Sequence, residues 1–375
     1  MRVIVSAAGT GGHINPAISI ANKIKEKQPD SEIIFIGTNR GLENDLVPRA
    51  GYKLKRIEAY GFKKEISIKN LKNILSTYKS TKKVKKIIDE FKPDLVVGTG
   101  GYICGPVFAA AVSKNIPTVL HESNAFPGKA VKMFAKKVDC VLVGLEDAKE
   151  NLKDAKKVVF TGNPTKIKKL DISTEQKKKI LSGLGIKNNL PIVLIFGGSQ
   201  GAQKINESIV ELIKSNLNEN YQMIWATGQN QYDIVKEDFE KSNISIKNIK
   251  NVTIVPYIYN MEELINIADL VICRSGAMTI TEIAICGKPA IFVPLPSRGA
   301  NRQEDNARVL EKLGAAKVIL NNELTGKKLA NQIDSVINNK NKLVQMGEAA
   351  RKIAPTNVEE KIYEEIEKVL ENKKD

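Results

Sequence analysis

Short runs of apolar, β-rich residues alternate along the chain with longer segments in which apolar residues recur at helical spacing. The runs do not alternate strictly with polar residues, which is typical of parallel strands that are buried on both faces. The first half of the chain holds runs at 3–5, 32–37, 94–101, 117–123 and 140–144. The second half holds runs at 191–201, 222–228, 252–258, 269–276 and 289–295. Alternation of strand and helix patterns predicts an α/β fold with doubly wound parallel sheets.

The pattern runs through the chain twice, which predicts two domains, as the length of 375 residues also favours. Between the two repeats lies a basic, polar stretch with Gly162 and Pro164, which is the composition of a linker. We therefore place the first domain at 1–163 and the second at 164–355. The pattern at 356–375 predicts a charged amphipathic helix, which we expect to pack back on the first domain.

Composition narrows the class of protein only slightly. A hydrophobic content of 42% and a charged content of 27% are ordinary for a globular protein. The four cysteines are widely spaced without a CxxC pair, which argues against a zinc site and favours a reducing, cytosolic setting. The sequence begins without a basic leader and cleavage site, and no run approaches the roughly 18 apolar residues of a membrane helix.

The formal net charge of +16 indicates an anionic partner such as a nucleic acid, an acidic membrane surface or a phosphorylated substrate. The alternative is that the lysine-rich composition has no functional meaning. Between Tyr52 and Lys92, however, thirteen basic and four acidic side chains give a local charge of +9. The same stretch contains the apolar residues Ile66, Ile68, Leu71, Ile74, Leu75 and Tyr78. A basic amphipathic segment suits an anionic bilayer, whereas its apolar face alone would equally suit a protein core.

Glycine-rich turns follow four of the predicted strands, at 9–12, 98–101, 197–201 and 275–276. Because ligands of parallel sheets bind at the carboxyl ends of the strands, these turns predict a site in a cleft between two facing domains. Glycines let a ligand approach the backbone, and the N-terminus of the following helix offers N–H groups to a phosphate. The first turn matches the dinucleotide fingerprint GxGxxG only partly, since Ile14 stands where the third glycine belongs.

Polar side chains beside these turns are candidates for chemistry. His13, one of two histidines, follows the first turn, where a helix N-terminus favours a neutral imidazole that takes a proton from a hydroxyl. The other, His121, precedes Glu122 and Asn124 in a polar cluster, and we interpret it mainly as orienting that loop. Glu282 lies inside a helix of apolar and small residues, so it either faces solvent or accepts hydrogen bonds from a ribose diol.

A pair of amides, Gln303 and Asn306, shares one face of a predicted helix three residues apart. Such a pair suits the hydroxyls of a sugar, or it simply faces solvent. The chain contains no DxD motif, so the sequence does not require a metal ion, and we expect no cofactor.

An ordered set of motifs closely resembles the MurG family of bacterial glycosyltransferases: GTGGHINPA, GTGGYICGPV, HESNAFPG, TGNP, GGSQGA and RSGAMTITEIAICGKPAIFVPLP with NRQEDNA after it. The match runs from residue 1 to about residue 316. The resemblance implies a GT-B fold of two Rossmann-like domains, the first for the acceptor and the membrane, the second for UDP-N-acetylglucosamine. It implies inverting transfer of N-acetylglucosamine to the 4-hydroxyl of a lipid-linked muramoyl-pentapeptide, in peptidoglycan synthesis, at the cytoplasmic face of the cell membrane.

The resemblance also assigns roles to residues. It places His13 beside the reacting centre as our candidate base, with Glu122 next, and Gly100 and Gly101 at the acceptor pyrophosphate. For the donor it implies contacts from Thr10, Gly11, Gly12, Asn124, Lys166, Ser199, Ile258, Ala277, Met278, Thr279, Glu282, Gln303 and Asn306. Lys166 stands where the family often has arginine, so a planar, bidentate contact is lost and its role in the donor site is in question.

Other functions stay open on the sequence alone. The same fold would serve a UDP-sugar epimerase or a synthase of diacylglycerol glycosides, which an acceptor-dependent assay of UDP release separates. A nicotinamide oxidoreductase is disfavoured by the missing third glycine. A nucleic-acid-binding protein ranks last and we expect no nucleic acid partner, because the chain has 5% aromatic residues and no recognisable RNA- or DNA-binding module.

Overall fold

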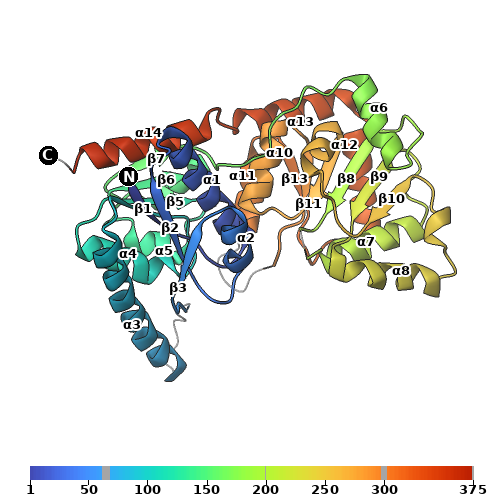
Figure 1. The fold of residues 1–375 in the computed structure, drawn as a ribbon. Coiled ribbons are helices and arrows are strands. Elements are labelled where there is room, and N and C mark those ends of the chain that lie inside the picture. The colour runs from blue at the N-terminus through green and yellow to red at the C-terminus, as the bar shows by residue number, and fades with distance from the viewer. Residues whose placement is uncertain (61–67, 199, 297–301, 374–375) are drawn as a thin grey trace. The chain divides into compact units, whose positions relative to one another are not determined.

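Two parallel sheets organise the chain in the computed structural model, which describes residues 1–60, 68–198, 200–296 and 302–373 (Figure 1). Unit 1 comprises Met1–Lys166 and Pro355–Asp375, and unit 2 comprises Ile167–Ala354. The linker composition placed the first boundary three residues earlier. Within the described ranges, no helix is long and apolar enough to span a membrane.

Unit 1 is built on a parallel sheet that has seven strands among the described residues, in the order β3-β2-β1-β4-β5-β6-β7. Its strands are β1 (Arg2–Ser6), β2 (Glu32–Gly37), β3 (Lys53–Arg56), β4 (Leu95–Gly98), β5 (Thr118–Glu122), β6 (Cys140–Val143) and β7 (Val158–Phe160). Its helices are α1 (Gly11–Lys27), α2 (Glu43–Arg49), α3 (Ile68–Phe91), α4 (Cys104–Ser113), α5 (Lys129–Phe134), the 3-10 helix η1 (Glu146–Asn151) and α14 (Val358–Glu371). The strand order reverses between β1 and β4, as in a doubly wound sheet.

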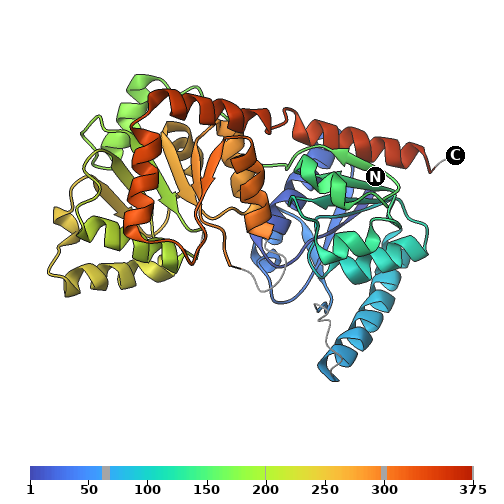
Figure 2. The same ribbon diagram turned by 180° about the vertical axis from the view of Figure 1, so that it is seen from behind.

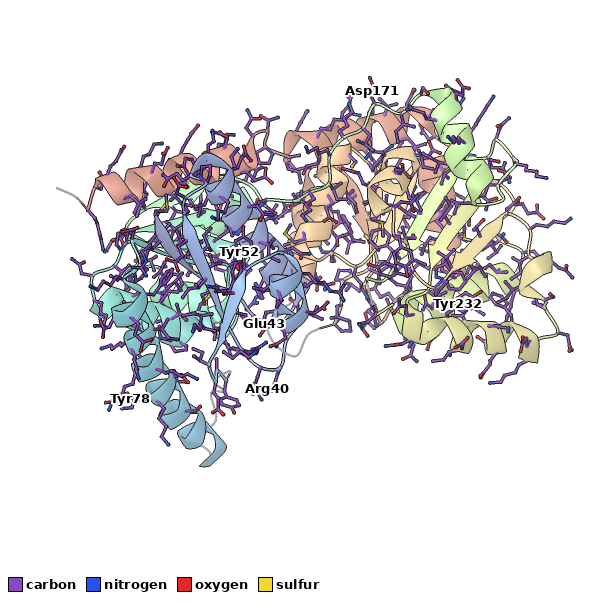
Figure 3. All side chains as sticks on the ribbon, viewed as in Figure 1. Arg40, Glu43, Tyr52, Tyr78, Asp171 and Tyr232 are labelled. Atoms are coloured by element: carbon purple, nitrogen blue, oxygen red, sulfur yellow. The ribbon has the colours of Figure 1, made fainter. Side chains whose placement is uncertain are left out.

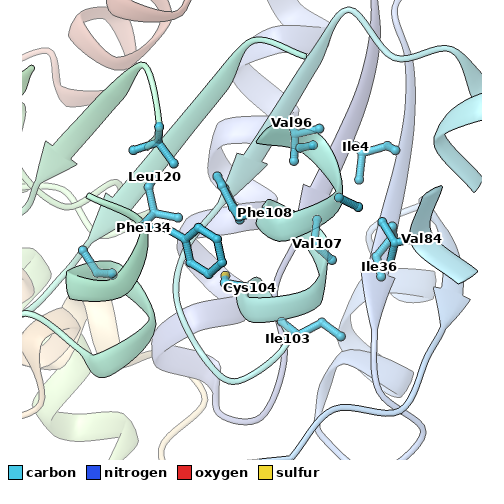
Figure 4. Close-up of a cluster of buried hydrophobic side chains, with 14 of the residues drawn as sticks. Ile4, Ile36, Val84, Val96, Ile103, Cys104, Val107, Phe108, Leu120 and Phe134 are labelled. Carbon is cyan, nitrogen blue, oxygen red and sulfur yellow. The ribbon is translucent and has the colours of Figure 1, made fainter. Parts of the chain in front are cut away.

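The central strands of unit 1 are buried along their whole length because helices cover both faces of the sheet. On one face the strands pack against α3, α4 and α5, and Figure 4 shows Val96 of the sheet near Phe108 of α4. On the other face, α1 and α14 contribute Ile14 and Ile362 to a second buried cluster.

The C-terminal helix α14 belongs to unit 1, although it is last in the sequence. Figure 2 shows it lying along that unit. Its Glu360 pairs with Lys23 and Lys27 of α1, and its Tyr363 hydroxyl accepts a hydrogen bond from Gln28 at 2.9 Å. Both apolar and ionic contacts therefore attach the end of the chain to the first domain.

Unit 2 repeats the architecture with a parallel sheet whose described strands number six, in the order β10-β9-β8-β11-β12-β13. The strands are β8 (Ile192–Phe196), β9 (Gln222–Ala226), β10 (Val252–Val255), β11 (Leu270–Cys273), β12 (Ala290–Phe292) and β13 (Ala316–Val318). The helices are α6 (Thr174–Gly183), α7 (Gln203–Lys214), η2 (Gln229–Gln231), α8 (Tyr232–Lys241), η3 (Ile246–Asn248), α9 (Met261–Ile267), α10 (Ala277–Cys286), α11 (Arg302–Lys312), α12 (Gly326–Ile337) and α13 (Lys340–Lys352).

The fold class expected from the sequence is confirmed. Each apolar run contains a strand of one of the two parallel sheets, and the segments with helical spacing form α1, α7 and α14. The apolar runs did not reveal β3, β7 or β13, which are all edge strands of the described sheets.

Candidate active site

Two glycine turns of unit 1 meet at the carboxyl ends of β1 and β4, which pair in parallel with Ser6 opposite Gly98. His13 lies in the first turn of α1, and its Nδ1 is 2.8 Å from the backbone oxygen of Thr99. The hydroxyl of Thr99 donates a hydrogen bond to the backbone oxygen of His13 at 2.7 Å. The residue that follows β4 therefore contacts both the ring and the backbone of His13.

The contact with Thr99 fixes the tautomer of the neutral His13 ring. A carbonyl oxygen only accepts hydrogen bonds, so Nδ1 carries the proton and donates it. Nε2 then holds the lone pair and is the nitrogen able to accept a proton. A β-carbon at Gly100 would lie 2.9 Å from Nδ1 and Cε1 of His13, so any larger residue there would displace the ring. The structure thus brings together His13 and the turn that was expected at the acceptor pyrophosphate.

The sequence analysis missed a carboxylate that holds the first glycine turn. Glu43 is fully buried, and it accepts a hydrogen bond from the backbone N–H of Gly9 at 2.9 Å. Burial by itself raises the pKa of the Glu43 carboxyl, but hydrogen bonds from Thr38 and Gly9 outweigh it and hold that pKa below its ordinary value. The signal in the sequence was a further glycine turn, at 37–41 after β2, with a glutamate two residues after it.

Glu122, the second candidate base, ends β5 and is 4% exposed. Its Oε1 accepts hydrogen bonds from the backbone and side-chain nitrogens of Asn124, at 2.9 and 2.8 Å. Its Oε2 accepts a hydrogen bond from the backbone of Gly128 at 2.6 Å. Both carboxylate oxygens therefore hold the 122–128 loop, which places the half-buried Asn124 in a loop of fixed shape.

His121 contacts the linker rather than its own loop. It is fully buried, and its Nε2 lies 3.1 Å from the backbone oxygen of Gly162. Because that oxygen is an acceptor, Nε2 carries the proton. Burial lowers the pKa of the His121 imidazole, so the ring stays neutral in the folded chain.

Acidification is expected to destabilise unit 1 through His121. The imidazole of the unfolded chain binds a proton near pH 6.5, whereas that of the folded chain does not. The free energy of unfolding therefore keeps its full value above pH 6.5 and decreases as the pH falls from 6.5 toward the lowered pKa of the folded state. Each pH unit within this window increases the equilibrium constant for unfolding by at most a factor of about ten. Thermal melting from about pH 7.5 to about pH 5 should depend less on pH in His121→Gln, which keeps a donor for Gly162. Identical pH dependence in both proteins contradicts the prediction.

Three turns of unit 2 lie side by side at one edge of its sheet. The last residue of β8, Phe196, pairs in parallel with Ala226 of β9 and Cys273 of β11. The turns that follow these strands, at 197–201, 227–228 and 274–276, therefore begin at the same height along the strand direction. This is the carboxyl edge, where ligands of such sheets bind.

The 197–201 turn packs directly on the turn after β9. Gly201 has a φ of +78°, and a β-carbon there would lie 2.1 Å from the backbone oxygen of Thr227, so only glycine fits. The buried side chain of Asn206 donates a hydrogen bond to the same oxygen at 2.9 Å and accepts one from the indole of Trp225 at 3.1 Å. Ser199, which was expected to bind a donor phosphate, lies outside the described residues.

Helix α10 begins after Gly276 and presents one partly exposed face. Met278, Thr279 and Glu282 are half-buried, and Glu282 lies four residues after Met278 and three after Thr279, on this face, whereas Ala277 is buried. In this helix, which is described in full, the first turn contains no acidic residue. Its N–H groups and the positive end of the helix dipole therefore favour an anion.

Asn306 through its amide and Gln303 through its backbone contact the turn that precedes α10. Asn306 is fully buried, and its Nδ2 donates to the backbone oxygen of Ser275 at 3.3 Å. The hydroxyl of Ser275 donates to the backbone oxygen of Gln303 at 2.7 Å, and Oε1 of Gln303 accepts from the backbone of Leu295 at 2.9 Å. The pair therefore holds the start of α11 against the Ser275 turn, beside the N-terminus of α10.

Two further candidates lie at the edges of the units. Ile258, which follows β10, is 6% exposed, so a ligand contact there comes from its backbone. The rings of its neighbours Tyr257 and Tyr259 pack edge to face, with centroids 4.9 Å apart.

Lys166 is exposed at the end of the first segment of unit 1. Among the described residues, no cluster of three or more histidine, cysteine or acidic side chains is arranged to hold a metal ion.

Comparison with known proteins defines the class. Residues 3–143 match the family model of the glycosyltransferase family 28 N-terminal domain, and residues 192–368 match that of the C-terminal domain. Each matched segment contains most of one sheet and its glycine turns. The fold and both matched segments are those of a family 28 glycosyltransferase.

The relatives narrow this class further. A protein of Acetivibrio thermocellus is 45% identical over 100% of this chain and 99% of its own length. Its name is UDP-N-acetylglucosamine–N-acetylmuramyl-(pentapeptide) pyrophosphoryl-undecaprenol N-acetylglucosamine transferase, and a protein of that name from Clostridioides difficile is 39% identical over 98% of this chain and 89% of its own. The crystal structure of Acinetobacter baumannii MurG has a TM-score of 0.77 at 28% identity, covering 98% of this chain and 99% of that one. The chain belongs to the MurG family, and the resemblance seen in its motifs is confirmed.

The fold is also shared with a different class of enzyme. UDP-GlcNAc 2-epimerase from Neisseria meningitidis, solved with UDP-GlcNAc bound, has a TM-score of 0.66 at 17% identity and covers 98% of this chain and 100% of its own. At that identity the likeness shows the fold alone.

Proposed function

We propose that this chain transfers N-acetylglucosamine from UDP-N-acetylglucosamine to the 4-hydroxyl of the muramoyl sugar of undecaprenyl-pyrophosphoryl-muramoyl-pentapeptide, a step of peptidoglycan synthesis. The observation that carries this proposal is the similarity, over essentially the whole chain, to transferases of that name. The glycine turns at the carboxyl edges of both sheets agree with it, because the donor and the acceptor each contain a pyrophosphate.

In this proposal unit 2 binds most of the UDP part of the donor. Its pyrophosphate accepts hydrogen bonds from the 197–201 turn with Ser199 and from the N-terminus of α10. Glu282 accepts hydrogen bonds from the ribose diol, and the backbone of Ile258 binds the uracil edge. The remaining donor contacts are those of Thr10, Gly11, Gly12, Asn124, Lys166, Ala277, Met278, Thr279, Gln303 and Asn306. Lys166 supplies charge without the bidentate geometry of an arginine.

The acceptor pyrophosphate binds to Gly100 and Gly101 of unit 1, beside His13. As the 4-hydroxyl oxygen bonds to C1 of N-acetylglucosamine, Nε2 of His13 takes its proton, and the bond from C1 to the phosphate oxygen breaks. UDP leaves with the electron pair, and the α-linked donor gives a β-linked product. The N-terminus of α10 stabilises the charge that grows on the leaving pyrophosphate.

Product formation tests the proposal. UDP release from UDP-N-acetylglucosamine is measured with a muramoyl-lipid acceptor, with diacylglycerol and with no acceptor. We expect release only with the muramoyl lipid, together with a disaccharide product. Release with diacylglycerol alone, or conversion of the donor to its 2-epimer without release of UDP, would refute the assignment.

We also propose that the chain binds peripherally to the anionic cytoplasmic face of the cell membrane through α3. In the described part of this helix, Val84 and Ile88 pack into the core of unit 1. The opposite face carries four exposed lysines within about two turns of the helix, namely Lys79, Lys82, Lys83 and Lys86. Tyr78 is 60% exposed and points away from the unit (Figure 3). Ile66 and the side chains of Ile68, Leu71, Ile74 and Leu75 lie outside the described residues.

Charge reversal at Lys79, Lys82, Lys83 and Lys86 is expected to abolish sedimentation with anionic vesicles, because exposed lysines attract the surface electrostatically. The wild-type chain should sediment at low salt and dissociate at high salt. The matched control reverses four exposed lysines of unit 2, Lys178, Lys179, Lys236 and Lys241, and should still sediment. Both variants should act normally on a soluble acceptor analogue. Equal binding of the wild type to neutral and anionic vesicles counts against the proposal.

A further inference from the structure

A fully buried glutamate supports the glycine turn that leads into His13. Glu43 begins α2, and its carboxylate lies inside unit 1 (Figure 3). Its Oε2 accepts the N–H of Gly9 at 2.9 Å, and its Oε1 accepts the backbone N–H and the hydroxyl of Thr38 at 2.9 and 2.6 Å. The donors come from the turns after β1 and β2, so one carboxylate joins two neighbouring strand ends.

The backbone around Glu43 fits the carboxylate closely. A β-carbon at Gly41 would lie 2.0 Å from Oε2 of Glu43 and 2.8 Å from the nitrogen of Gly9. The backbone N–H of Leu42 donates to the oxygen of Gly9 at 3.2 Å. The 41–43 segment therefore contacts both polar groups of Gly9 and fixes its orientation.

The orientation of Gly9 determines where α1 begins. Gly9 directly precedes Thr10, whose backbone oxygen accepts the N–H of His13 at 3.0 Å and that of Ile14 at 3.2 Å. These hydrogen bonds form the first turn of the helix. A rotation at Gly9 would therefore move His13, whose ring is held from the other side by Thr99.

We propose that Glu43 is a positioning residue for the transfer reaction, holding the Gly9 turn so that Nε2 of His13 meets the acceptor hydroxyl. This inference rests on the proposed role of His13 as the base. A buried carboxylate is costly unless all its hydrogen bonds are made, and here the backbone donors of two turns make them. An uncharged residue of the same shape cannot replace it, because an amide has a single acceptor oxygen.

The substitution Glu43→Gln tests the proposal. The amide NH2 group must face either the N–H of Gly9 or that of Thr38, and the turn shifts to relieve this contact. We expect kcat to fall roughly 10- to 100-fold, the scale of a displacement of about 1 Å at a reacting group. UDP affinity should change much less than kcat, because most of the proposed UDP contacts lie in unit 2. Asp45→Asn, on the same helix at an exposed position, removes the same charge and should keep wild-type kcat.

The ring resonances of His13 in NMR spectra separate positioning from general stability. The chain has two histidines, so the buried His121 serves as the internal reference. Spectra of Glu43→Gln are recorded well below its melting temperature, where the protein is folded. The His13 signals should differ from those of the wild type, and the His121 signals should not. If Glu43→Gln does not fold, Thr38→Val removes one of the three hydrogen bonds to Glu43, together with the exposed 3.3 Å hydrogen bond from the backbone of Arg40, and should shift the same signals less.

Unchanged His13 signals in folded Glu43→Gln overturn the inference, whether or not kcat falls. Shifted signals with wild-type kcat have a different meaning. The positioning of His13 by Glu43 then stands, but the role of His13 as the base fails, and His13→Ala should in that case also retain activity.

Discussion

Replacement of His13 by alanine is expected to lower kcat by roughly 100-fold or more, the usual contribution of a general base. The backbone of Thr99 binds Nδ1 and so leaves the lone pair on Nε2, which makes the ring a proton acceptor at the end of β1. UDP affinity should change far less, because the imidazole is not among its proposed contacts. Steady-state kinetics with a soluble acceptor analogue and calorimetry with UDP measure the two quantities.

The variant His13→Gln is the matched control for the shape of the site. Glutamine can donate a hydrogen bond in place of Nδ1 but cannot accept the proton, so it should be as slow as alanine. Both variants should lose the acidic limb of the pH–rate profile. Near-normal kcat in either one, or a parallel collapse of UDP affinity, would make His13 a structural residue. Glu122 would then be the next candidate, and proton transfer to it would have to break a hydrogen bond of the 122–128 loop.

Replacement of Glu282 by alanine is expected to weaken UDP binding roughly 10- to 100-fold. Glu282 is half-buried on the face of α10 that carries Thr279, one turn from the N-terminus where the proposal places the pyrophosphate. A ribose diol that loses a charged acceptor loses about 1.5–3 kcal/mol. Calorimetry with UDP measures the effect. The control Glu237→Ala, at an exposed position on α8, should bind UDP normally, and unchanged affinity in folded Glu282→Ala would refute the ribose contact.

The sequence predicted the centre of each sheet well because a strand covered on both faces must be apolar at nearly every position. The prediction failed at the edge strands for the same physical reason, because a strand with exposed positions need not be apolar throughout. The edge strand β3 reads Lys53–Arg56 with one apolar side chain, since its exposed positions are free to be basic. Strands β7 and β13 are also edge strands, and most of their residues are only partly buried.

The candidate site was predictable only in part. Glycine turns and the rare histidine are local features, so His13 was found from the sequence. Thr99 and Glu43 were not found, because their contacts join positions 86 and 34 residues apart in the chain. Only the parallel register of β1 with β2 and β4 brings those positions together, and no local pattern encodes that register.

The attachment of α14 to unit 1 sets an order of events during synthesis. Unit 2 is a continuous segment that is made entirely after residue 166 and before residue 355, so the ribosome delivers all of it before α14. One face of the unit 1 sheet, which α1 covers only in part, stays incompletely covered until Ile362 and its neighbours emerge. The domain that is started first is therefore finished last, and a truncated chain that ends after unit 2 leaves its first domain, not its second, with exposed apolar surface.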